Sequence, residues 1–145
     1  MFENSCNDLS LDKKTRDHLA AIICAGYIEG YSCYITADIF NEACNKINYP
    51  SDMFKYLVDK EDVSELAFLY VNTCTFRSIN KFYLIRAKSD PGIVGTEISA
   101  CGDDFTCSKC KKMDGKRFSI NKVPTIPFHW GCRCTYFDIF KGERI

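Results

Sequence analysis

The chain has 145 residues, of which 46% are hydrophobic and 14% aromatic. A chain of this length and composition can bury a core of its own, so we expect one folded domain, or a small domain with a helical arm. These values exclude an intrinsically disordered chain. No apolar run in the sequence reaches the length that a transmembrane helix requires.

Charge is balanced over the whole chain but not along it. Nineteen basic and nineteen acidic side chains give a net charge of zero, yet residues 107–145 hold nine basic and three acidic ones. A mildly basic tail favours nucleic acid or an acidic partner surface. The simpler interpretation is a solvated face that keeps this segment soluble.

The chain contains ten cysteines, a number that would indicate a disulfide scaffold in a secreted protein. The N-terminal residues MFENSCND show neither a basic segment nor an apolar one, so no classical signal peptide is evident. We therefore expect a cytoplasmic protein whose paired cysteines bind a metal. The scattered cysteines are expected to be mostly buried thiols: Cys6, Cys24, Cys33, Cys44, Cys74 and Cys101.

The first predicted helix follows a loose N-terminal segment. Ser10 is the expected N-cap, and Asp12 falls in the first turn. Apolar residues then recur at helical spacing from Leu19 to Ile28. Gly30 is expected to end the helix, because glycine adopts the left-handed conformation common after a helix C-terminus.

A second, shorter helix is predicted from Thr36, as its N-cap, to about Ile47. Its apolar positions, among them Ile39 and Ile47, are expected to face inward. Pro50 disfavours helix at the residue before it and so marks a break. Ser51 is expected to begin a short third helix.

The longest periodic segment runs from residue 62 to residue 88 and carries one broad apolar stripe. Such a stripe predicts a helix that faces the core, without any cofactor. The turn-forming residues 89–92 follow it, and then a strand is predicted over 93–100. Shorter strands are predicted over 117–120 and 135–140.

Pro124 and Pro127 exclude a helix ahead of the last strand and favour an extended connection. The fold class expected from these elements is α+β. A helical N-terminal region, residues 1–61, precedes a domain at 62–145, and a small β-rich zinc-binding lobe occupies 101–140.

The strongest chemical signal is a set of cysteines and one histidine in this lobe. Cys107 and Cys110 form a C-x-x-C pair, and His129, Cys132 and Cys134 follow about twenty residues later. This spacing is typical of a structural zinc site with four ligands. We expect Cys134 to be one ligand and leave His129 and Cys132 as alternatives for the last position. Disulfides or plain buried thiols are less consistent with the polar residues around the first pair.

Several residues near these candidate ligands are expected to support the metal site without binding the metal themselves. Asp103, Asp104 and Asp114 are expected to lie in turns and to support the zinc loop rather than to act as acids or bases. Arg133 is expected to pair with one of these aspartates, and Trp130 to pack over the zinc loop. The candidate nucleic-acid contacts are Lys109, Lys111, Lys112, Lys116 and Arg117.

Patterns typical of zinc-dependent enzymes are missing from the sequence. There is no H-E-x-x-H segment, no H-x-E with P-C-x-x-C, and no P-loop. The only histidines are His18 and His129, too few for a histidine-rich hydrolytic centre. We therefore expect a non-enzymatic protein. An enzyme would need three protein ligands, an open zinc position and His129 as a base.

One ordered set of residues resembles the phage Mu F-like head-morphogenesis (minor capsid) family over about residues 64–137. Upstream, a helix with polar residues at Asn72, Thr73, Arg77 and Asn80 precedes a strand that ends at Ile98, as in that family. The motif residues, in order, are Asp103-Asp104, Cys107, Cys110, Asp114-Gly115-Lys116, Phe118, Pro124, Pro127, His129 and Cys132-Arg133-Cys134-Thr135.

The resemblance implies a prophage or phage protein with a role in head assembly and a capsid-like or portal-like protein partner. It also makes association with the virion the alternative to a cytoplasmic location. A zinc-stabilised assembly or interaction protein is therefore our expectation. The alternatives are a zinc-ribbon-like nucleic-acid-binding module and a small prophage-derived effector or toxin enzyme.

Overall fold

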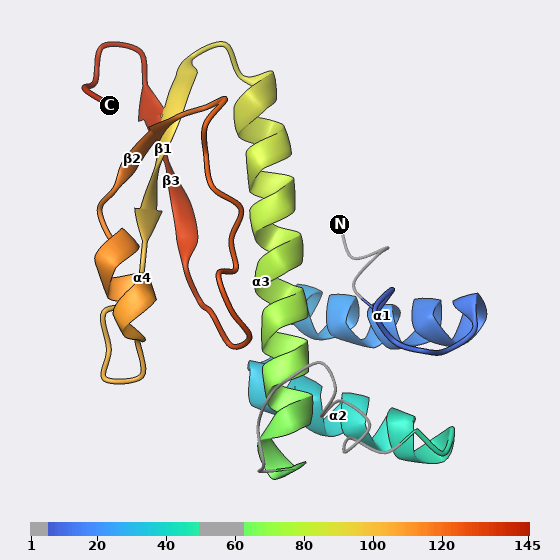
Figure 1. The fold of residues 1–145 in the computed structure, drawn as a ribbon. Helices are drawn as coiled ribbons and strands as arrows, with labels where there is room; N and C mark the ends of the chain where they lie inside the picture. Colours follow the sequence, from blue (N-terminus) through green and yellow to red (C-terminus); the bar gives the residue numbers. More distant parts are fainter. Residues whose placement is uncertain (1–5, 50–62) are drawn as a thin grey trace.

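A computed structural model describes residues 6–49 and 63–145. The fold is α+β, as expected, with a helical N-terminal part and a small sheet in the C-terminal part. One long helix, α3 (Val63–Ser89), runs through the molecule. It separates the two N-terminal helices from the sheet (Figure 1). The short helix expected after Ser51, and the predicted boundary between residues 61 and 62, lie outside the described residues.

Helix α1 spans Lys13–Ile28, close to the first predicted helix. Its N-cap is Asp12, not Ser10, because the carboxylate of Asp12 accepts a hydrogen bond from the backbone N–H of Thr15 at 3.1 Å. The end of the helix agrees with expectation: Gly30 follows it with a φ of +71°.

Helix α2 spans Cys33–Lys46 and begins four residues before the predicted position. Ser32, rather than Thr36, is the N-cap, since its hydroxyl accepts a hydrogen bond from the N–H of Ile35. The Thr36 hydroxyl instead donates to the Ser32 carbonyl at 3.1 Å from inside the first turn. Ile39 and Ile47 were expected to face inward, but they are 42% and 40% exposed.

Helix α3, Val63–Ser89, confirms the longest predicted helix. Its first half packs against α1 and α2 in a core that includes Leu66, Tyr70 and Cys74. Its second half packs against the sheet through Tyr83 and Leu84. The helix therefore belongs to both cores. No helix in the described ranges is long and apolar enough to cross a membrane.

Three antiparallel strands form the sheet, and all three were predicted. Strand β1, Ile93–Ser99, lies in the centre, with β2, Arg117–Ser119, on one side and β3, Thr135–Phe140, on the other. A short helix that the sequence analysis missed, α4 (Ser108–Met113), lies between β1 and β2. Six residues are too few to show a helical hydrophobic period.

The connection from β2 to β3 contains no helix, as its prolines required. Tyr136 of β3 holds it in place with its hydroxyl, which accepts a hydrogen bond from the N–H of Ile126 and donates one to the Pro124 carbonyl. The side chains of Ile98, Ile126 and Tyr136 are buried together in the second core. The extended connection is thereby fixed against the sheet.

Helices α1 and α2 approach closely at Gly26. A Cβ atom at this position would lie 2.3 Å from Oγ1 and 2.6 Å from Cγ2 of Thr36. We expect Gly26→Ala to lower the free energy of unfolding by about 1–3 kcal/mol through overpacking, although alanine is the better helix former. The measurement is urea unfolding followed by circular dichroism.

The substitution Thr36→Ala removes Oγ1 and Cγ2, the two atoms with which a methyl group at residue 26 would clash. The double variant Gly26→Ala/Thr36→Ala should therefore be more stable than the sum of the two single effects indicates. Additive effects would contradict the close contact between these helices.

Candidate metal centre

The five predicted ligands come from three different parts of the lobe. Cys107 directly precedes α4 and caps it, because its sulfur accepts a hydrogen bond from the N–H of Cys110 at 3.4 Å. Cys110 lies inside α4. His129 and Cys132 lie on the loop before β3, and Cys134 directly precedes that strand. The fold thus brings together residues separated by up to about a fifth of the chain.

All five side chains meet around Cys110. The Nε2 atom of His129 lies 3.1 Å from the sulfurs of both Cys107 and Cys110. These three form one group whose ligand atoms lie within 4.8 Å of one another, and Cys110, Cys132 and Cys134 form a second. Every predicted ligand therefore belongs to one continuous cluster.

The Cys110 and Cys132 sulfurs are 3.7 Å apart. That is far beyond the length of a disulfide bond, about 2.05 Å. It matches an edge of a tetrahedron around zinc, about 3.8 Å for Zn–S bonds of about 2.3 Å. Each of the ten cysteines has a free thiol.

The imidazole of His129 is oriented for coordination through Nε2. Its Nδ1 lies 2.7 Å from the carbonyl oxygen of Trp130. Because a carbonyl only accepts hydrogen bonds, Nδ1 carries a proton, and in the neutral imidazole Nε2 then keeps its lone pair. That lone pair faces the sulfurs of Cys107 and Cys110. Metal-binding histidines are commonly held by such a bond from the second ring nitrogen.

The environment of the thiols is uneven. The backbone N–H of Cys110 donates to the sulfur of Cys107 and lowers the pKa of that thiol. Burial raises the pKa of Cys110 and raises that of Cys134 to about 12. Buried thiols of this kind stay protonated unless a cation compensates for the thiolate charge. The donor set thus fits a soft divalent metal ion.

Helix α3 holds the loop that carries the later ligands. The Thr73 hydroxyl oxygen accepts a hydrogen bond from the N–H of Gly131 at 2.8 Å. About two helical turns further along the same side of α3, the side-chain amide of Asn80 donates a hydrogen bond to the carbonyl of Cys134 at 2.9 Å. Both side chains on the helix are buried. The two bonds fix the backbone on either side of Cys132.

Trp130 packs differently from the expected lid over the zinc loop. Its ring stacks on Tyr70 at a centroid distance of 5.7 Å, and the Arg77 guanidinium lies 5.5 Å from its centroid. Trp130 thus joins the ligand loop to the core formed with α1 and α2. Gly131 follows with a φ of +77°, and a Cβ there would lie 2.9 Å from a methyl carbon of Leu69.

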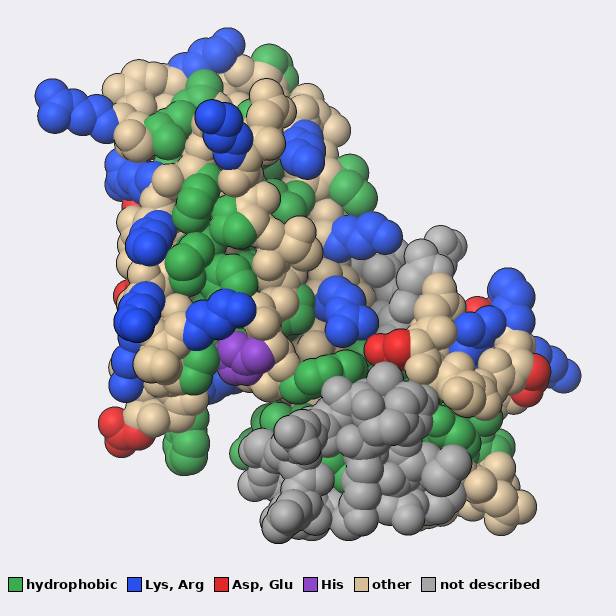
Figure 2. Space-filling view, in the orientation of Figure 1, with side chains coloured by type: hydrophobic (Ala, Val, Ile, Leu, Met, Phe, Trp, Pro, Cys, Tyr) green, Lys and Arg blue, Asp and Glu red, His purple; other side chains and the backbone are tan. Residues whose placement is uncertain are grey.

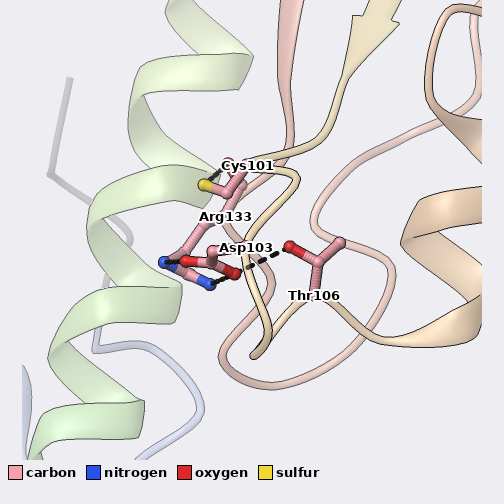
Figure 3. A network of polar contacts seen from close by, with 4 residues as sticks. All are labelled: Cys101, Asp103, Thr106 and Arg133. Atoms are coloured by element: carbon pink, nitrogen blue, oxygen red, sulfur yellow. Dashed lines mark hydrogen bonds and ion pairs between the residues drawn. The ribbon is translucent and has the colours of Figure 1, made fainter.

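Arg133 pairs with Asp103, one of the three aspartates considered from the sequence (Figure 3). Two hydrogen bonds of 2.7 Å join the guanidinium to the carboxylate, and the Thr106 hydroxyl donates a third, of 2.8 Å. These bonds lower the pKa of Asp103 to about 2. The Cys101 thiol contacts the Arg133 carbonyl from the other side.

The other two aspartates are placed differently. Asp114 ends α4, and its carboxylate accepts a hydrogen bond from the N–H of Ala100 at 2.8 Å, so it ties the end of β1 to the turn before β2. Asp104 is exposed. Neither of these two carboxylates belongs to the metal-ligand groups found among the described residues.

The five basic residues named as nucleic-acid contacts differ in their surroundings. Arg117 is paired with Glu97 at 2.7 Å, and its guanidinium also donates to the Arg144 carbonyl. The Lys109 ammonium lies 5.4 Å from the ring centroid of Phe128. The remaining three are exposed on α4 or just after it: Lys111, Lys112 and Lys116.

Comparison with family models, curated proteins and solved structures finds no match for this chain. The site must therefore be judged on its own chemistry. Four thiols and one imidazole converge, and they line a cavity of about 20 Å³, the size of one water molecule or small ion. This cluster can hold a metal ion.

Sequence reasoning found the ligands but missed the side chains that support them. Thr73 and Asn80 are seven residues apart, so both project from the same side of α3. They interrupt an otherwise apolar stripe. A buried polar residue needs a hydrogen-bond partner, so their position in the stripe was a usable signal. Nothing in the sequence indicated that the partner is the ligand loop.

Truncating Asn80 tests its bond to the ligand loop. We expect Asn80→Ala to lower the free energy of unfolding by about 1–3 kcal/mol more than Asn72→Ala does, because it leaves the buried Cys134 carbonyl unpaired. Asn72 is a matched control: it is 2% exposed, on the same helix, and its side-chain Nδ2 has no hydrogen-bond partner among the described residues. Equal losses in chemical denaturation would contradict this role for Asn80.

Proposed function

We propose that this chain is a zinc-stabilised, non-enzymatic assembly or interaction protein. The observation that carries the proposal is the convergence of five metal-binding side chains around Cys110. Zinc suits a donor set of thiolates and imidazole and has no redox chemistry of its own. Its role would be to supply folding free energy to a lobe with only a small core.

The ligands that fit best are Cys107, Cys110, His129 and Cys132. The first three already lie within 4.8 Å of one another, and Cys132 is 3.7 Å from Cys110. The sequence left His129 and Cys132 as alternatives and favoured Cys134. The orientation of the His129 lone pair supports including it. Cys134 would then be a buried thiol beside the metal.

A structural rather than catalytic metal is supported by the number of donors. A catalytic zinc keeps one position for water or substrate, whereas here five side chains compete for four positions. The cavity of about 20 Å³ accommodates a single small ion. A substrate could reach such a metal only by displacing one of the protein ligands.

The assembly role rests on the resemblance to the phage Mu F-like head-morphogenesis family. We propose a protein partner, capsid-like or portal-like, rather than nucleic acid. The pairing of Arg117 with Glu97 supports this choice, because it neutralises one of the five candidate phosphate contacts. Exposed aromatic and aliphatic side chains also suit a protein interface, among them Phe105 at 90% exposure.

Metal removal tests the structural role. Protein purified without chelator should contain one zinc ion per chain, and a strong chelator should lower its melting temperature by about 10 °C or more. Elemental analysis and thermal unfolding give the two readouts. A metal-free chain whose melting temperature is indifferent to the chelator would refute the zinc proposal.

Single substitutions test the ligand set. Cys110→Ser should abolish stoichiometric zinc binding, and His129→Ala and Cys132→Ser should weaken it by at least about tenfold, since each removes one of four ligands. Cys134→Ser should retain one zinc ion per chain, and so should the control Cys101→Ser, which changes a thiol that lines the same cavity. Loss of zinc in Cys134→Ser with retention in Cys132→Ser would overturn the assignment.

A further inference from the structure

A second hollow lies away from the metal cluster, between α3 and the connection that leads to β3. It has a volume of about 300 Å³. Six residues of α3 line one side, and the other side comes from Thr125, Ile126 and Tyr136. In Figure 2, Lys and Arg side chains lie among hydrophobic ones along this face of the lobe, and the acidic side chains lie toward its edges.

The floor of this groove is aliphatic and its rim is cationic. Leu84 and Ile85 contribute apolar surface, and the side chain of Ile85 is 57% exposed, whereas Ile126 is buried at 2% exposure. The rim carries Arg77, Lys81 and Lys88, and no acidic residue is among the lining residues. Eleven residues separate the first and last of these cations, a distance of about 16 Å along a helix.

The charge on this rim is largely free. Among residues 6–49 and 63–145, neither Lys81 nor Lys88 forms an ion pair. Arg77 lies 3.6 Å from a carboxylate oxygen of Asp8, so its charge is partly compensated. The nearby Asp138 of β3 is paired with Arg86 at 2.6 Å and does not compensate the lysines.

The lining of the groove suits a peptide better than a nucleic acid. Single-stranded nucleic acid binds by stacking its bases on open aromatic rings. The one aromatic residue of the lining, Tyr136, is 2% exposed and lies against Tyr83. Aliphatic side chains of a peptide can enter the floor while acidic ones meet the lysines on the rim.

We propose that this groove binds an acidic amphipathic segment of a partner protein, about three helical turns or five extended residues long. Apolar side chains of the segment would contact Leu84 and Ile85. Its carboxylates would pair with Lys81 and Lys88. This inference gives the proposed assembly role a class of partner and rests on that role, but it does not depend on which residues bind the metal.

The test uses fluorescence anisotropy with the full chain and four labelled probes. The first is a twelve-residue peptide with leucine at every third or fourth position and glutamate elsewhere. The second replaces its leucines by serine, and the third replaces its glutamates by lysine. The fourth is a single-stranded DNA of twelve nucleotides. We expect the first peptide to bind at low salt, more weakly as salt increases, and at least about tenfold more tightly than the other probes.

Two variants locate the binding. Lys81→Glu/Lys88→Glu and Ile85→Ser should each weaken binding of the acidic peptide by about tenfold or more. Lys14→Glu/Lys141→Glu makes the same change in net charge with two exposed lysines that do not line the groove, and it should bind normally. Zinc content and melting temperature are measured for every variant, so a folding defect is recognised separately.

Three other outcomes would overturn the inference, and a fourth would contradict only the metal proposal. Equal weakening in the control pair would show binding by net charge alone. Tighter binding of the DNA, lost in the Lys81 and Lys88 variant, would make the groove a nucleic-acid site. A zinc-containing chain that binds no probe would refute the groove and leave the metal proposal intact. A metal-free chain that still binds the peptide through Lys81 and Lys88 would refute the metal proposal and leave the groove intact.

Discussion

The docking of the ligand loop onto α3 is the contact on which the rest of the structure depends. Thr73 and Asn80 bind the backbone at Gly131 and Cys134, while Trp130 stacks on Tyr70 of the same helix. A loop with this composition has no secondary structure to define its path. The helix provides that path, and it does so with side chains that are themselves buried in a packed core.

The same contact connects the two halves of the molecule. Tyr70 belongs to the core shared with α1 and α2, whereas Tyr83, four helical turns further on, belongs to the core of the sheet. Because both cores are built on one continuous helix, a metal that stabilised the ligand loop would also stabilise the far half of the chain. An assembly protein would gain a rigid frame from this arrangement, on which exposed surfaces keep fixed relative positions.

The cysteine and histidine cluster and the lysines of α3 lie in different environments within this structure. Three of the thiols, Cys110, Cys132 and Cys134, are buried, whereas Cys107 is half-buried and the imidazole of His129 is exposed. The salt bridge between Arg133 and Asp103 fixes the residue between Cys132 and Cys134. The lysines Lys81 and Lys88 of α3 lie instead on a solvent-exposed rim. There, their charge would attract an oppositely charged partner over a distance of about 8–10 Å. The cysteine and histidine cluster and the groove therefore lie in different places, although side chains of α3 contact the loop of the one and line the other.

Much of the secondary structure, and all five residues of the metal cluster, could be predicted from the sequence, because they depend on local spacing. Residues close together in the sequence determine the hydrophobic period of α3, the turn before β1 and the C-x-x-C pair. Helix N-caps were placed wrongly at Ser10 and Thr36 because several polar residues compete for each cap, and backbone geometry decides between them. The exposure of Ile39, the support from Asn80 and the groove beside Lys81 depend on residues brought together over long separations in the chain, so only the tertiary structure could decide them.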